Sequence, residues 1–139
     1  MVGVPVVPAS RTVKVPVYRS FSGPPPWLEA DVVEVVTCSE QVVGSGAFGL
    51  RVAGYGLQGA GVMAGDVLLF SKRPISPGCL AAVQVGEDVL VRRVWPNQPD
   101  GTYLRAASPA VPDIVVPDWR HTMAIGVAVV MMRRVELMV

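Results

Sequence analysis

Histidine, cysteine and lysine are scarce in this chain. Among its 139 residues it has one histidine, His121, and two cysteines, Cys38 and Cys79. So few imidazole and thiol groups leave little material for a metal centre, a histidine relay or a disulfide framework, and no CxxC motif is present. We therefore expect no metal and no cofactor.

Charge is also low, and neither sign dominates. Charged residues make up 17% of the chain, and the formal net charge is +1. A protein that binds DNA by itself needs a basic surface to neutralise phosphates, so direct nucleic-acid binding by this chain is disfavoured. The hydrophobic content of 51% excludes a disordered chain.

Long hydrophobic runs are absent as well. The longest is the nine-residue run Ala124–Met132, whereas about 20 residues are needed for a helix to span a bilayer. Residues 1–8 are apolar, but Pro5 and Pro8 interrupt them and no basic residue precedes them, unlike a signal peptide. These features predict no membrane association and a cytoplasmic location.

Valine is the residue that the chain has in abundance. It has 29 valines, with 14 glycines and 13 prolines to separate them. Valine is stiff at its first side-chain torsion and favours strands, while glycine and proline mark turns. The composition therefore predicts a mostly β fold with little helix. We expect an N-terminal tail over residues 1–11 and one domain over residues 12–139, with no helix-turn-helix.

The apolar runs give the positions of the expected strands. These strands cover residues 12–19, 31–37, 47–53, 66–72, 80–85, 87–94, 102–106, 114–116 and 121–134. Residues 54–65 are predicted to form a loop or a single helical turn, and Gly86 to close a hairpin. Pro16 favours an edge position for the first strand. Gly65 and Asp66 predict a tight turn in which Asp66 accepts backbone N–H groups.

Four blocks of sequence follow one another in a recognisable order. The first is LRVAGYGLQGAGVMAGDVLLF at residues 50–70, where a strand leads to spaced glycines, a methionine and a Gly-Asp pair. The others are EDVLVRRV at 87–94, YLRAASPAVPDIVV at 103–116 and GVAVVMMR at 126–133. Together they resemble the LexA repressor/UmuD family of self-cleaving serine peptidases. The resemblance implies a compact, mostly β peptidase-like domain with strongly bent sheets.

The resemblance also assigns the two catalytic positions. The family's nucleophilic serine falls at Gly56, which has no side chain to attack a carbonyl. The family's general-base lysine falls at Arg92, and a guanidinium stays protonated in proteins. We therefore expect no intact dyad. Gly56 is interpreted as a loop glycine with positive φ or a close approach, and Arg92 as a cation paired with a carboxylate or with loop carbonyls.

A cleavage-like segment precedes these blocks. Residues 15–18, VPVY, followed by SGP at 22–24, are similar to the family's self-cleavage site, so the cleavage-like bond lies between Ser22 and Gly23. Three prolines follow and stiffen the segment. A dyad relocated to Lys14 or Lys72 remains the alternative for an active enzyme.

The expected function is that of a catalytically inactive LexA/UmuD-like domain that acts by dimerisation or partner binding, in DNA-damage response or transcription regulation. The resemblance implies a homodimer and, as further partners, the RecA filament, a translesion polymerase or a related repressor. A self-cleaving peptidase and the oligomerisation fragment of a phage-type repressor are the alternatives. The last strand is apolar on both faces, which predicts a dimer interface at Val129, Val130, Met131 and Met132.

Overall fold

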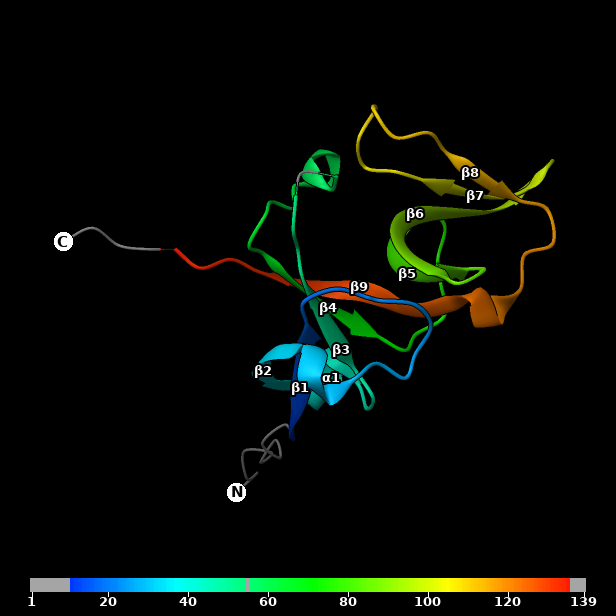
Figure 1. Cartoon of the computed structure of the whole chain (residues 1–139). Coiled ribbons are helices and arrows are strands. Elements are labelled where there is room, and N and C mark those ends of the chain that lie inside the picture. The colour runs from blue at the N-terminus through cyan, green and yellow to red at the C-terminus, as the bar shows by residue number, and fades with distance from the viewer. Residues whose placement is uncertain (1–10, 55, 136–139) are drawn as a thin grey trace, which may run out of the picture.

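A computed structural model describes residues 11–54 and 56–135, and in it these residues form one nine-stranded sheet with short helical turns (Figure 1). The mostly β fold with little helix is confirmed. The expected tail over residues 1–11 lies outside the described residues except for Arg11.

The strands follow the predicted order closely. They are β1 Thr12–Tyr18, β2 Val32–Ser39, β3 Phe48–Arg51, β4 Val67–Ser71, β5 Cys79–Val85, β6 Asp88–Gln98, β7 Gly101–Arg105, β8 Ile114–Val116 and β9 Ala124–Met132. The helical elements are α1 Glu40–Val43 and the 3-10 turns η1 Glu29–Asp31, η2 Gln58–Ala60 and η3 His121–Met123. Residues 54–65 thus hold a single helical turn, as expected.

The order of strands across the sheet is β2-β1-β3-β4-β9-β5-β6-β7-β8. All neighbouring strands are antiparallel except β1 and β3, which are parallel. β9 lies between β4 and β5 and joins the two halves of the sheet, as Figure 1 shows. The predicted β5–β6 hairpin is present, with Gly86 at φ +61° in its turn.

The edge position that Pro16 suggested for the first strand is wrong. β2 occupies that edge, and β1 lies between β2 and β3. β3 pairs only with Val17 and Tyr18 at the end of β1, whereas Pro16 pairs with Val35 of β2. Proline is tolerated there because the missing N–H falls where β1 has a strand on one side only.

The last predicted strand is shorter than expected and does not lie at an edge over its whole length. Residues His121–Met123 form the 3-10 turn η3, and β9 begins only at Ala124. The first part of β9 pairs with β5 over Ala124 to Val127, and β9 pairs with β4 from Val127 to Met132. Residues 128–132 of β9 therefore have a strand neighbour on one side among the described residues.

Three clusters of buried side chains form the core. The first surrounds Phe48 and Phe70, whose rings stack with centroids 5.2 Å apart. The second gathers valines and Leu69 between β1, β4 and α1, and the third lies between β5, β6, β7 and β8. Helix α1 was not predicted. It ends at Gly44, whose φ is +73°, and it buries Val43 in the second cluster.

Candidate functional site

The two residues at the assigned catalytic positions line one pocket. This pocket has a volume of about 340 Å³, and both Gly56 and Arg92 are among its lining residues. Its walls come from the chain after β1, from β3 and the loop that follows it, and from β6. The full lining is Arg19, Ser20, Phe21, Leu50, Arg51, Val52, Ala53, Gly56, Leu57, Val89, Val91, Arg92 and Val111.

No close approach of a described residue requires a glycine at position 56. A Cβ atom built on Gly56 would meet no heavy atom within 4 Å. The interpretation of Gly56 as a glycine needed for a close approach is therefore not supported by the described residues. A side chain at position 56 would extend into open space at the pocket wall, so the fold itself admits a serine there.

Among the described residues, Arg92 pairs with a carbonyl of its own strand, and neither the carboxylate nor the loop carbonyls expected as partners are found. Its Nη1 donates to the Val91 carbonyl at 3.1 Å, while its Nε is buried and has no partner among the described residues. Arg93, the next residue of β6, instead donates through Nη1 to the Gly78 carbonyl at 3.1 Å. This agrees with the alternation of side chains along a strand.

No replacement base is found among the described lining residues, which include no lysine, histidine or carboxylate. Lys14 lies on β1, and Lys72 follows β4, where its side chain approaches Gly46. Ser20 supplies a hydroxyl to the pocket. A nucleophilic serine needs an adjacent base, so Ser20 alone does not make a dyad.

The cleavage-like bond lies in a segment that crosses the core. We call residues 19–28 the crossover segment; Figure 1 draws it in blue, passing from β1 across β4 and β9. Phe21 anchors it, with its ring stacked on Trp27 at a centroid distance of 4.5 Å. Trp27 Nε1 donates to the Gly23 carbonyl at 2.8 Å.

Ser22 and Gly23 themselves are not among the lining residues of the pocket. Gly23 has φ +79°, and a Cβ atom built on it would lie 3.7 Å from the Glu87 carbonyl oxygen in the β5–β6 turn. The structure therefore brings residues 19–21 to Gly56 and Arg92, and places the cleavage-like bond beside the hairpin turn.

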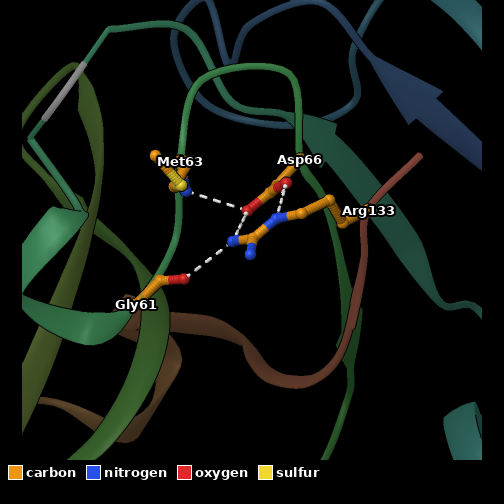
Figure 2. A network of polar contacts seen from close by, with 4 residues as sticks. All are labelled: Gly61, Met63, Asp66 and Arg133. Carbon is orange, nitrogen blue, oxygen red and sulfur yellow. Dashed lines mark hydrogen bonds and ion pairs between the residues drawn. The ribbon is translucent and has the colours of Figure 1, made fainter. Parts of the chain in front are cut away.

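Among the described residues, the buried carboxylate of Asp66 has three charged or polar hydrogen-bond contacts. Figure 2 shows its carboxylate between the Met63 N–H, which donates at 2.8 Å, and Arg133, which donates from Nε at 2.9 Å and from Nη2 at 2.8 Å. Arg133 Nη2 also donates to the Gly61 carbonyl at 3.1 Å. The Arg133 hydrogen bonds, followed by that of Met63, lower the pKa of Asp66 from 3.8 to about 2.

The sequence predicted half of this network. The turn in which Asp66 accepts a backbone N–H is confirmed by the Met63 contact. The ion pair with Arg133 was missed, because the two residues are brought together only by the pairing of β4 with β9. The hydrogen bonds of Arg133 to Asp66 and Gly61 connect the end of β9 to the loop that follows Gly56.

The residues of the expected dimer interface differ in exposure. Val129 and Val130 are half-buried and pack against the second core cluster. Met131 and Met132 are 44% and 42% exposed.

Over residues 11–54 and 56–135, no helix has the length and apolarity needed to cross a membrane.

Comparison with known proteins extends over most of the chain. Residues 16–129 match the family described as Peptidase S24-like. The LexA repressor of Anaeromyxobacter sp. (strain Fw109-5) is 29% identical over 133 residues, which cover 91% of this chain and 57% of the relative. The LexA repressor of Anaeromyxobacter dehalogenans (strain 2CP-1 / ATCC BAA-258) is 27% identical over 136 residues, which cover 94% and 59%.

This chain thus spans little more than half the length of these curated relatives. The match confirms the resemblance that the four sequence blocks indicated, and it agrees with the mostly β sheet. The chain belongs to the Peptidase S24-like family.

Proposed function

We propose that this chain is a non-cleaving member of its family that acts by dimerisation and partner binding in DNA-damage response or transcription regulation. The observation that carries the proposal is the pocket shared by Gly56 and Arg92. A glycine supplies no nucleophile, and a guanidinium does not accept the proton that a serine must lose. The described part of the pocket holds no lysine or histidine that could take over the role of base.

The test of inactivity is the intact mass of the chain after incubation at pH 9–10, where an appreciable fraction of a lysine with the ordinary pKa of about 10.4 is neutral and able to act as a base. The incubation is run with and without activated RecA filament. We expect no change in mass. A product cut between Ser22 and Gly23 would overturn the proposal and favour a self-cleaving peptidase with a relocated dyad.

A pair of variants tests the assigned positions directly. Gly56→Ser alone should stay intact, because Arg92 still cannot act as a base. Gly56→Ser combined with Arg92→Lys restores both chemical groups, and the open space around position 56 admits the new side chain. Cleavage by the double variant but not by the single one supports the assignment. Cleavage by the single variant would refute it.

The dimer is proposed at the free edge of β9. Residues 128–132 pair with β4 on one side only among the described residues, and this stretch contains the exposed Met131 and Met132. The other side of the stretch is proposed to pair with the same stretch of a second copy of the chain. Antiparallel pairing across a two-fold axis satisfies backbone groups and covers both methionines at once.

Light scattering should give about twice the chain mass of 14.7 kDa. Met131→Arg or Met132→Arg should give a folded monomer, because an unpaired charge buried in an apolar contact costs several kcal/mol. Val115→Arg is the matched control, since Val115 is 45% exposed on β8, an edge strand of the sheet that is separated from β9 by β5, β6 and β7. A monomeric wild type at micromolar concentration would refute the dimer.

The proposed partner class is supported by the names of the relatives. Because these relatives are LexA repressors, a related repressor is favoured as partner, or as the longer protein of which this domain would be the oligomerisation part. A RecA filament and a translesion polymerase are the other proposed partners, and the proposed location of the chain is the cytoplasm. Co-purification with each protein, using Met131→Arg as comparison, distinguishes dimer-dependent from dimer-independent binding.

A further inference from the structure

The pocket of Gly56 and Arg92 is rich in positive charge. Three arginines line it, Arg19, Arg51 and Arg92, and no described lining residue is acidic. Such a gathering of guanidinium groups is notable in a chain whose net charge is only +1. Like charges held near one another favour the binding of an anion between them.

The three arginines differ in the ion pairs and hydrogen bonds that their side chains make. Arg51 Nη2 lies 3.1 Å from Glu34 Oε1, so that a carboxylate outside the pocket already balances it. Arg19 is exposed and has no side-chain hydrogen bond or ion pair with a described residue. Arg92 uses one N–H on the Val91 carbonyl, and its Nε is without a partner in the described structure. A buried donor without a partner is costly, and the planar fork of a guanidinium matches a carboxylate.

The remaining walls are apolar. Leu50, Val52, Leu57, Val89 and Val91 surround the arginines. An inorganic phosphate makes no favourable contact with these apolar walls. A peptide can pack aliphatic side chains against them and pair a carboxylate with the arginines. The volume of about 340 Å³ lies at the lower end of the roughly 300–1,000 Å³ of ligand pockets, and so fits a few residues.

The edge of β6 beside the pocket is open to an extended chain. β6 pairs with β7 from Arg93 onward, and residues 88–92 pair only with β5 among the described strands. Val89, Val91 and Arg92 of this open stretch line the pocket. An extended peptide can therefore hydrogen-bond along the strand while its side chains enter the pocket.

We propose that this pocket binds an extended peptide of a partner protein in which an acidic side chain is flanked by apolar residues, with Arg92 and Arg19 pairing with the carboxylate. The proposal rests on the proposed loss of cleavage, because it gives Arg92 a ligand in place of a proton-transfer role. It names the partner chemistry for which the site is suited.

The test uses two acetylated and amidated six-residue peptides, Ala-Val-Asp-Val-Ala-Ala and the same peptide with Asn in place of Asp. Binding to the full chain is measured by calorimetry at low and at 0.5 M salt. We expect the acidic peptide to bind at least tenfold more tightly at low salt, and the difference to shrink at high salt.

Arg92→Gln and Arg19→Gln should each reduce the preference for the acidic peptide to about twofold or less, in proteins whose circular dichroism is unchanged. Arg19 is exposed, so its variant keeps the test valid if Arg92→Gln does not fold. Arg105→Gln is the control, because Arg105 pairs with Asp113 outside the pocket. Its preference should equal that of the wild type.

Equal binding of the two peptides, no binding at millimolar concentration, or equal competition by inorganic phosphate or a short DNA duplex would overturn the peptide proposal. None of these results depends on chain cleavage, which the intact-mass measurement reports separately. A cleaved chain that still prefers the acidic peptide would refute the proposed inactivity alone.

Discussion

Removal of the Phe21 ring tests whether the crossover segment is fixed to the core. The ring stacks on Trp27 with 15° between the planes and meets Phe48 and Phe70 edge-on at centroid distances of 5.6 and 5.7 Å. Truncation of a fully buried phenylalanine to alanine costs about 3–5 kcal/mol. Because Phe21 is half-buried, we expect Phe21→Ala to lower the free energy of unfolding by about 2–3 kcal/mol.

Urea unfolding followed by circular dichroism measures this loss. Leu28→Ala is the matched control in the same segment, since Leu28 is 70% exposed and its truncation should change the free energy of unfolding by less than about 0.5 kcal/mol. Amide hydrogen exchange of residues 19–28 should rise in Phe21→Ala and not in Leu28→Ala. A loss below about 1 kcal/mol with unchanged exchange would show that the ring does not hold the segment, and the reasoning would fail.

Two further predictions concern the loop between β3 and β4 and the packing of β3. Since the pKa of Asp66 is lowered to about 2, its ionised form stabilises the folded state above about pH 5, and this contribution disappears as pH falls from about 4 to 2. The stability difference between wild type and Asp66→Asn, measured by thermal unfolding, should therefore shrink over that range; a constant difference would contradict the ion pair with Arg133. Gly49→Ala should destabilise by about 1–3 kcal/mol in urea unfolding, because its Cβ would lie 2.9 Å from Val17 Cγ2 and 3.0 Å from Leu69 Cδ2. An unchanged midpoint would mean that the neighbours move aside.

Most strands could be predicted from the sequence because their valine runs are bounded by glycine and proline. The bounds of β8 agree with the prediction, and β4 differs by one residue at each end. Helix α1 was missed because four residues are too few to show a helical period. The turn η3 was missed because His121–Met123 directly precede the apolar run of β9, and only the tertiary structure shows where the chain bends.

The candidate site was accessible to sequence reasoning only through the resemblance. No local pattern relates Gly56 to Arg92, which lie on different elements and meet at one pocket. Arg19 and Arg51 were not predicted to join them, because their convergence depends on how β1, β3 and β6 are placed in the sheet.

The position of β9 has a consequence for synthesis of the protein on the ribosome. β4 and β5 follow one another in the chain, yet they are not neighbours, because β9 fills the place between them. Until β9 has been translated, two four-stranded units carry facing edges with unpaired backbone groups. At about 5–20 residues per second, the residues from the end of β5 to β9 take on the order of a few seconds to make. A nascent chain stalled before Ala124 should therefore be prone to aggregation and to capture by chaperones.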